Sequence, residues 1–347
     1  MNDILAKELI SNLKRRDLMQ PVNYLHRMDD ISSILKVGVE KKSDALVTII
    51  IPAYRRPDLF SYAINSVLNQ KLFSDFEIVI ADDSEELASE YEKIVKDLGD
   101  DRIRYYKNEK RLGWYNWNRL LELTDTPWIC MLHDDDVLYD KHLYYMKKML
   151  DRSKDADMIV CERIFMQNEE HQVNICEGDI NQVMPRKNDY REWNFRFGSF
   201  MLGAWIKREK AVELGGFDDE IISLDYEFLA KMAMHGMVYT CPLPIYGYGV
   251  KANESMKADM WEKMLISEFY ICNSMIQHRN LLLRPILRKI EQYSIACHAE
   301  DMSHPSKNIY GVEMDAERLC SWLNVKYSLR NSLLWKTIMK LHYMMLS

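Results

Sequence analysis

The sequence predicts an α/β fold in which a mostly parallel sheet is flanked by helices. Short apolar runs rich in β-branched residues alternate with longer segments whose apolar residues recur at helical spacing. Acidic residues directly follow two of these runs, as Asp82-Asp83 and as Asp134-Asp135-Asp136. Because ligands of such sheets bind beyond the carboxyl ends of the strands, these acidic residues mark the expected site.

The expected elements follow one another in order along the chain. Strands are expected at residues 47–51, 76–81, 103–106, 128–132 and 158–161. Helices are expected at residues 57–70, 85–98, 113–123, 209–215 and 224–235, and from residue 259 onward. The pattern divides the chain into a helical N-terminal extension (1–45), an α/β domain (46–255) and a helical C-terminal region (256–347).

Composition and charge favour a globular protein with a large core and argue against several kinds of partner and site. The chain has 347 residues, of which 48% are hydrophobic, so it can bury a large core. Its net charge of −7 argues against nucleic acid as a partner. No stretch suits a membrane-spanning helix, and the first residues lack the apolar core of a signal peptide. The seven cysteines include no CxxC pair, which argues against zinc and favours a reducing, cytoplasmic location.

The segment His133-Asp134-Asp135-Asp136 follows the apolar run 128–132 without a gap. Three successive carboxylates at the exit of a buried strand repel one another, and each raises the pKa of its neighbours. A hard divalent cation such as Mg²⁺ or Mn²⁺ would relieve this repulsion and leave coordination positions for substrate phosphates. A solvated acidic turn is the alternative interpretation.

Five stretches resemble motifs of the family 2 glycosyltransferases, which have the GT-A fold, and they occur in the order of that family. They are VTIIIPAYRRPDLFSYAINSVLNQ (47–70), FEIVIADDSE (76–85), GWYNWN (113–118), WICMLHDDDVL (128–138) and GGFDDEIISLDYEFLAKMAMHG (215–236). The third and fourth are similar to a bacterial branch that makes surface polysaccharides. The resemblance implies transfer of a sugar, with inversion, from a nucleotide-diphosphate donor to a saccharide or lipid-linked acceptor, with Mn²⁺ or Mg²⁺ as cofactor.

The resemblance also implies roles within the acidic segment. Asp135 is the first choice as a direct metal ligand, and Asp134 or Asp136 would support it or bind the donor ribose. We therefore assign Asp135 and Asp136 to the metal and Asp134 to the donor. The family more often has Asp at the position of His133, so this histidine is either a hydrogen-bonding group beside the metal or a packed residue at the strand end.

The donor site follows from the same resemblance. Asp82 matches an aspartate that accepts a hydrogen bond from the base, which favours a uracil or thymine nucleotide and hence a UDP-sugar. Its alternative role is to cap the following helix. The other expected donor contacts are Pro52, Ala53, Tyr54, Arg56, Arg111, Gly113 and Asn118. Tyr54 offers a ring for stacking, and the arginines would face phosphates unless they are surface charges. Gly113 would open a helix whose amino end suits a diphosphate.

A base must take the proton of the acceptor hydroxyl. The family has an acidic pair at the start of the helix after GGFD, and here that pair reads Leu224-Asp225. The remaining acid, Asp225, is the expected general base, and its alternative role is the helix N-cap. Residues 165–200, which are polar with a cluster of aromatic residues, form either an acceptor-binding loop or an irregular lid.

Residues 324–347 are expected to form a basic amphipathic helix with four basic and no acidic residues. Lys326, Arg330, Lys336 and Lys340 fall within about a 120° arc of the helical wheel. Such a helix suits an anionic membrane surface, or it packs on the catalytic domain or on a second subunit. Peripheral membrane contact and an oligomer are therefore both open.

Two other functions are compatible with parts of the sequence. Leu224 and His133 replace acidic residues of the family pattern, which would suit a catalytically inactive scaffold that binds nucleotide-sugars. A Mg²⁺-dependent phosphotransferase would also use the acidic segment. However, a D-x-D-x-T/V pattern beginning at Asp134 would need Thr or Val where this chain has Leu138.

Overall fold

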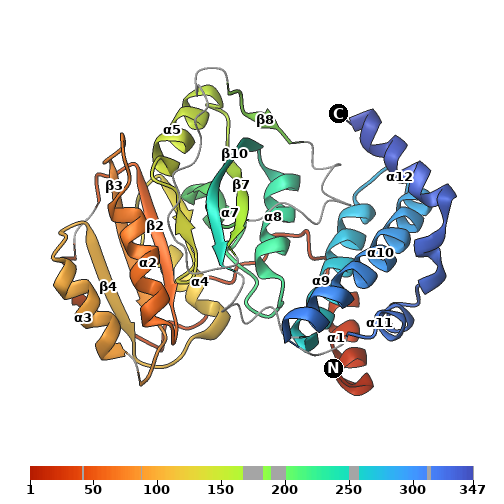
Figure 1. Ribbon diagram of the computed structural model, residues 1–347, viewed down its shortest axis with the longest axis horizontal. Helices are drawn as coiled ribbons and strands as arrows, with labels where there is room; N and C mark the ends of the chain where they lie inside the picture. The colour runs from red at the N-terminus through yellow and green to blue at the C-terminus, as the bar shows by residue number, and fades with distance from the viewer. Residues whose placement is uncertain are drawn as a thin grey trace.

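The molecule has two parts, a sheet covered by helices and a group of helices that contains both ends of the chain (Figure 1). The computed structural model describes residues 1–40, 43–86, 88–166, 183–188, 201–249, 258–310 and 314–346. The first helix, α1 (Asp3–Lys14), lies among the last helices of the chain rather than beside the strand that follows it in sequence.

The sheet has ten strands within the described residues, in the order β1-β4-β3-β2-β5-β9-β7-β10-β6, with β8 paired to β10. The neighbours β4, β3, β2 and β5 are parallel, as are β7 and β10, whereas the other pairs are antiparallel. The strands are β1 (Ser33–Val37), β2 (Val47–Ala53), β3 (Phe76–Asp82), β4 (Ile103–Asn108), β5 (Trp128–Met131), β6 (Val137–Leu138), β7 (Met158–Met166), β8 (Arg186–Lys187), β9 (Trp205–Lys207) and β10 (Val238–Gly249).

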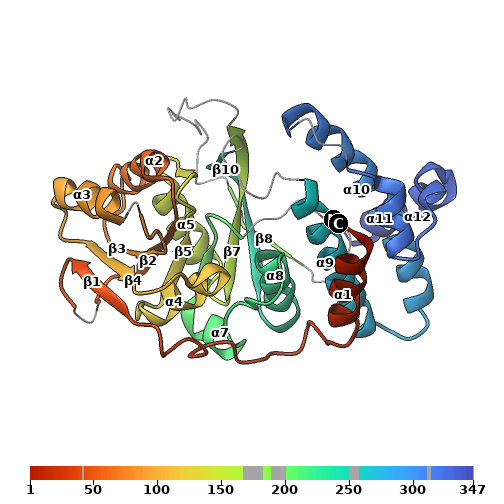
Figure 2. The same ribbon diagram turned by 90° about the horizontal axis from the view of Figure 1, so that it is seen from below.

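Helices cover both faces of the parallel strands, with α2 and α3 on one face and α4 on the other (Figure 2). The central strands β2 and β3 are accordingly buried along nearly their whole length. Besides α1, the helices are α2 (Pro57–Leu68), α3 (Ala88–Leu98), α4 (Asn116–Glu122), α5 (His142–Arg152), α7 (Arg208–Glu213), α8 (Leu224–His235), α9 (Ala258–Gln277), α10 (Arg284–Tyr310), α11 (Ala316–Trp322) and α12 (Leu333–Leu346).

The predicted α/β fold is confirmed, and the elements between residues 47 and 132 have the predicted type and order. The prediction of a helical segment over residues 1–45 is wrong for its second half. Among the residues described there, only α1 is an α-helix, and Ser33–Val37 pairs with β4 as an antiparallel edge strand. This short strand is only half-buried, so the open edge of β4, rather than its own apolar pattern, decides its conformation.

The helix expected at residues 113–123 also begins differently. Gly113 has a φ of +60°, which is a left-handed conformation that does not continue into an α-helix. Residues Gly113–Tyr115 therefore form a 3₁₀ turn (η1), and α4 begins only at Asn116.

Residues 15–30, here called the strap, run from α1 across to the sheet. The N–H of Tyr24 donates to the carbonyl oxygen of Gly215 over 2.8 Å. Farther back along the strap, the carbonyl oxygen of Met19 lies 2.8 Å from Nε2 of His235 in α8. A Cβ added to Gly215 would lie 1.9 Å from the carbonyl oxygen of Val22, so this close approach requires glycine.

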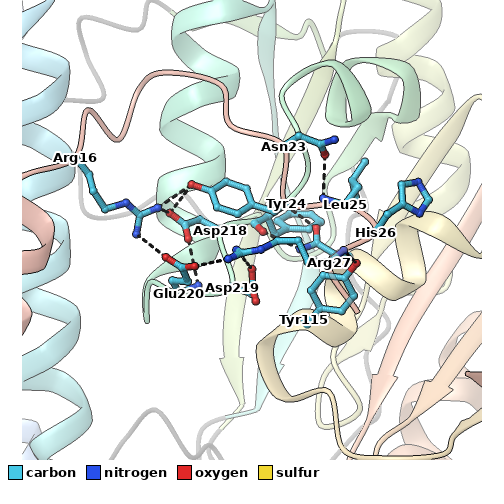
Figure 3. A network of polar contacts seen from close by, with 12 residues as sticks. Arg16, Asn23, Tyr24, Leu25, His26, Arg27, Tyr115, Asp218, Asp219 and Glu220 are labelled. Atoms are coloured by element: carbon cyan, nitrogen blue, oxygen red, sulfur yellow. Dashed lines mark hydrogen bonds and ion pairs between the residues drawn. The ribbon is translucent and has the colours of Figure 1, made fainter. Parts of the chain in front are cut away.

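The strap also carries the partners of a buried carboxylate. Asp218 has no exposed surface, and it pairs with Arg16 and accepts a hydrogen bond of 2.9 Å from the Tyr24 hydroxyl (Figure 3). Arg27 pairs with Asp219 over 3.1 Å. Because a buried carboxylate needs such partners, the strap fixes the turn that precedes α8.

The segment 324–347 is split between two short elements, a 3₁₀ helix (η4, Tyr327–Asn331) and α12. The side chains of Trp335, Ile338 and Met339 pack against a small apolar cluster on α9 and α10, whereas those of Leu333 and Leu334 are exposed. Part of this amphipathic segment therefore packs on protein. None of the helices in the described residues is long and apolar enough to cross a membrane.

Replacing Gly215 by alanine should destabilise the protein more than the same change at Gly99. Both glycines have positive φ, but a Cβ at position 99 would meet nothing within 4 Å. We expect Gly99→Ala to cost about 1 kcal/mol of unfolding free energy from backbone strain. We expect Gly215→Ala to cost a further 1–3 kcal/mol, roughly, because it displaces the strap. Chemical denaturation of both variants tests this, and equal losses would mean that the strap is not tightly packed there.

Candidate active site

Strands from distant parts of the chain bring polar residues to one edge of the sheet. Tyr54 directly follows β2, Asp82 ends β3, and residues 134–136 follow β5. The last residue of β10, Gly249, reaches the same place and donates its N–H to Asp136 Oδ1 over 2.7 Å. The three parallel strands β3, β2 and β5 are neighbours, so their carboxyl ends form one continuous rim.

Asp134, Asp135 and Asp136, here called the acidic cluster, are buried, with exposures of 1%, 5% and 1%. The interpretation of this segment as a solvated acidic turn is therefore wrong. Arg56 compensates part of the charge: its Nη2 lies 2.8 Å from Asp134 Oδ1, and its Nη1 pairs with Asp135. Arg56 is thus engaged with the cluster and is not the plain surface charge that the sequence left open.

The protonation of the cluster reflects its burial. Burial raises the pKa of Asp134 to about 7, against the opposing effect of Arg56. Burial, followed by the charge of Asp135, raises the pKa of Asp136 well above its usual range. Burial disfavours the charge of Arg56 as well, but Asp134 and Asp135 more than offset it, and the pKa of Arg56 is raised. One guanidinium therefore leaves the cluster short of positive charge, and a divalent cation would be bound favourably there.

His133 joins two members of the cluster in a group that could hold a metal ion. One ligand atom each from His133, Asp135 and Asp136 lie within 4.8 Å of one another. Burial lowers the pKa of His133 to about 4, so the imidazole is neutral and has a lone pair to offer. Asp135 Oδ1 is buried and has no hydrogen-bond partner, which is an acceptor that a cation would satisfy. The residues present therefore fit a divalent metal.

Sequence reasoning gave His133 too small a part. Its ring does pack on Trp117, with 5.0 Å between the ring centroids, as one of the two interpretations held. Its Nδ1, however, faces the cluster, 3.8 Å from Asp136 Oδ2 and 4.0 Å from Asp135 Oδ1. The signal was available, because a histidine adjoining three aspartates offers a metal ligand without adding charge.

Close approach of β10 holds the cluster in place. The hydroxyl of Tyr246 donates to Asp136, which also accepts the N–H of Gly249. A Cβ at Gly249 would lie 2.3 Å from the carbonyl oxygen of Asp135, so glycine is required for the strand to come this near.

Tyr54 lies between the acidic cluster and two arginines. Its N–H donates to Asp134 Oδ2 over 2.9 Å. The guanidinium carbon of Arg111 lies 4.4 Å from the Tyr54 ring centroid, and that of Arg55 lies 5.3 Å away. Arg55 has a φ of +57°, a strained conformation that occurs here between Tyr54 and Arg56. The rim therefore presents an aromatic ring with adjacent positive charge, which suits a base and phosphates.

Asp82 is less accessible than the sequence suggested. It has no exposed surface, and its carboxylate accepts hydrogen bonds of 2.7 Å from the Tyr105 hydroxyl and the Ser84 N–H. Burial raises its pKa. It does not cap α3, because that helix begins at Ala88. Contact between Asp82 and a base requires the groups that cover Asp82, among them Tyr105 and Ser84, to move. Pro52 and Ala53 are the last two residues of the neighbouring strand β2.

Two expected donor contacts have partners within the protein. The N–H of Gly113, expected to face a diphosphate, donates to Asp83 Oδ2 over 2.7 Å. The amide of Asn118 is fully buried, donating to the Phe217 carbonyl over 2.8 Å and accepting the Phe217 N–H over 2.7 Å. Both groups are therefore engaged within the protein: Asp83 fixes the loop before η1, and Asn118 ties α4 to the turn before α8.

Asp225 lies in the first turn of α8, while Ser223 occupies the N-cap position, so the capping alternative for Asp225 is wrong. Burial raises the pKa of Asp225, and the nearby charge of Arg163 opposes this shift. Arg163 pairs in the sheet with Tyr246, the residue that binds Asp136. Arg163 in β7 thus has Asp225 near it in charge and Tyr246, a partner of the acidic cluster, beside it in the sheet.

Part of the expected acceptor side lies outside the described residues. Residues 167–182 and 189–200 hold most of the polar and aromatic segment. The site described above is built entirely from the remaining parts of the chain.

Comparison with known sequences gives the following relatives. Residues 48–214 match the model of the family described as glycosyl transferase family 2. An uncharacterized glycosyltransferase of Methanocaldococcus jannaschii is 22% identical over 278 residues, which cover 76% of this chain and 83% of that protein. A GalNAc(5)-diNAcBac-PP-undecaprenol beta-1,3-glucosyltransferase of Campylobacter jejuni is 34% identical over 96 residues, or 26% of this chain and 30% of that protein.

Among solved structures, the chain is similar to a mannosyltransferase of Pyrobaculum calidifontis in complex with GDP-Man and Mn²⁺. The TM-score is 0.52 at 15% sequence identity, and the match covers 97% of this chain and 96% of the other. At that identity the likeness concerns the fold, and it agrees with an α/β chain of the GT-A type.

Replacing Arg56 by glutamine should destabilise the metal-free protein and increase its response to a divalent cation. Without the guanidinium, two buried carboxylates lose their partner, at a cost of about 2–3 kcal/mol. In thermal unfolding with a chelator, Arg56→Gln should melt lower than the unmodified chain, and Mn²⁺ should raise its melting temperature by more.

Arg102→Gln is the matched control, because its pair with Asp100 lies near the surface, where such pairs contribute about 0–1 kcal/mol. Equal Mn²⁺-induced shifts in all three proteins would contradict the view that the cluster lacks positive charge.

Proposed function

We propose that this chain, which belongs to glycosyltransferase family 2 through residues 48–214, transfers a sugar from a nucleotide-diphosphate donor to an acceptor hydroxyl. The reaction proceeds with inversion and depends on a divalent cation. A UDP-sugar is the favoured donor, the acceptor is a saccharide or lipid-linked molecule, and the setting is cell-surface polysaccharide synthesis. The observation that carries the proposal is the buried acidic cluster beside Tyr54 at the carboxyl edge of the parallel strands.

His133, Asp135 and Asp136 would hold the cation, and Asp134 would position Arg56 and the Tyr54 backbone. A cation bound there supplies charge stabilisation for the nucleoside diphosphate as it leaves. Carboxylates suit both Mg²⁺ and Mn²⁺, and an imidazole ligand favours Mn²⁺ of the two. The Mn²⁺ in the Pyrobaculum mannosyltransferase supports this choice.

Tyr54, Arg111 and Arg56 would contact the donor. The Tyr54 ring is placed to stack on the base, and the Arg111 guanidinium that lies over it is placed for phosphate oxygens. Arg56, already engaged with carboxylates, keeps the cluster compact before the donor binds. We keep Asp82 as the residue that selects the base, through the movement of its covering groups described above.

Asp225 would act as the general base that takes the proton from the acceptor hydroxyl. Its raised pKa makes this carboxylate a stronger base than an exposed aspartate. Asp225 lies in the first turn of α8, and the strap and Asn118 fix the turn that precedes this helix. A rigid support of this kind is what an acid–base residue needs for a constant geometry.

The acceptor and the location are finer parts of the proposal. The Campylobacter relative, by its name, acts on an undecaprenol-diphosphate-linked glycan, which supports a lipid-linked acceptor here. We propose a transferase domain over residues 46–255 that is completed by the edge strand Ser33–Val37, with α1 before it and a helical part after it, in a cytoplasmic protein that contacts the membrane peripherally through residues 324–347.

Calorimetric titration with UDP-, dTDP-, GDP- and CMP-sugars, each with and without Mn²⁺, tests the proposal. We expect one nucleotide class, UDP or dTDP, to bind, and only when Mn²⁺ is present, because the phosphates and the cluster share the cation. Asp135→Asn should abolish the dependence of donor binding on Mn²⁺. Asp140→Asn is the control and should keep that dependence, because the Asp140 carboxylate pairs with Lys71 near the surface.

Equal donor affinity with and without Mn²⁺ would contradict the proposed role of the acidic cluster. The absence of binding by every nucleotide-sugar would overturn the proposed function itself.

Asp225→Asn should lower the rate of transfer by at least about 10²-fold and leave donor affinity close to that of the unmodified chain. The amide has nearly the same shape but cannot accept a proton. Asp219→Asn, a change in the turn before α8 to a residue that pairs with the strap, is the control and should retain transfer. If Asp225→Asn weakens donor binding as much as it slows transfer, Asp225 is not the base.

A further inference from the structure

The turn between α9 and α10 exposes three successive leucines. Leu281, Leu282 and Leu283 are 71%, 84% and 47% exposed, and Ile286 in the first turn of α10 is 49% exposed. Scattered exposed apolar residues are common, but a contiguous group of this kind marks an interaction surface.

The helix α12 packs directly beside this turn. A small apolar cluster joins them, formed by Ile276, Leu287 and Ile290 and covered by Trp335, Ile338 and Met339. The helices α10 and α12 lie at the end of the molecule away from the sheet (Figure 1). Leu333, Leu334 and Leu341 of α12 are exposed as well, and we call these residues and the leucine turn together the apolar end.

The exposed apolar residues of the apolar end lie close in sequence to basic residues. The stretches 269–290 and 324–347 contain eight Lys or Arg residues and no Asp or Glu, although the chain as a whole has a net charge of −7. Of these, Arg288, Lys289, Lys326, Lys336 and Lys340 are exposed. Exposed apolar residues with exposed basic residues beside them in sequence, on a protein of negative net charge, are matched in chemistry by an anionic lipid surface.

We propose that the apolar end docks on an anionic phospholipid bilayer, with Leu281–Leu283 entering the headgroup region. This extends the peripheral contact proposed above for residues 324–347 to a second segment. It rests on the proposed function, because a transferase that acts on a lipid-linked acceptor has to reach the membrane surface. A second copy of the chain fits less well, because a symmetric contact would bring the same positive charges face to face.

Co-sedimentation of the full chain with vesicles tests the proposal. Vesicles of phosphatidylcholine alone are compared with vesicles that also contain phosphatidylglycerol. We expect at least about tenfold stronger binding to the anionic vesicles, weakened by salt. The triple variant Leu281→Ser, Leu282→Ser, Leu283→Ser should lose most of this binding, as should Lys336→Gln with Lys340→Gln.

Matched controls separate this surface from general effects. Ile4→Ser with Val39→Ser changes residues that are 77% and 69% exposed elsewhere, and Lys93→Gln with Lys96→Gln removes exposed charges on α3. Both should bind vesicles like the unmodified chain. Thermal unfolding of each variant shows that it is folded.

Three results would overturn the proposal. These are equal binding to both kinds of vesicle, no binding to either, and a leucine variant that changes self-association but not vesicle binding. Donor titration in the absence of vesicles is a separate readout. If the chain binds vesicles but no donor, the result counts against the proposed function. If it binds the donor but no vesicles, the result counts against membrane docking alone.

Discussion

Three carboxylates buried at the end of β5 impose the constraint to which the rest of the site responds. Burial raises the pKa of Asp134 and Asp136, so the cluster needs donors and positive charge from several directions. These come from Arg56 after β2, from the N–H groups of Tyr54 and Gly249, and from the Tyr246 hydroxyl. The strained turn before Arg56 and the glycine that ends β10 are both explained by this demand.

Another buried carboxylate organises the turn before α8. Asp218, in the turn before α8, obtains its partners Arg16 and Tyr24 from the strap. The strap begins at α1, which packs with the helical part, so the position of α8 is coupled to the helices far from the sheet. Asp225 thus stands on a helix that two parts of the chain hold in place, as the acid–base role proposed for it demands.

The proposed activities use opposite kinds of surface. The donor site gathers buried negative charge that a small cation can neutralise, whereas the apolar end displays positive charge and exposed leucines. A protein with net charge −7 would be repelled by an anionic bilayer over most of its surface. The stretches 269–290 and 324–347 have basic but no acidic residues, and this local excess of positive charge would therefore orient the molecule on a membrane as well as attach it.

The sequence by itself determined the order of strands and helices between residues 47 and 132, because fully apolar strands and amphipathic helices carry their own periodicity. It also located the acidic cluster, since strand ends meet at one rim of a parallel sheet. Only the tertiary structure decided that Ser33–Val37 would pair with β4, and which side chains were already engaged. Asn118, Gly113 and His133 show the reason: hydrogen bonds and burial depend on partners distant in sequence, which no local pattern records.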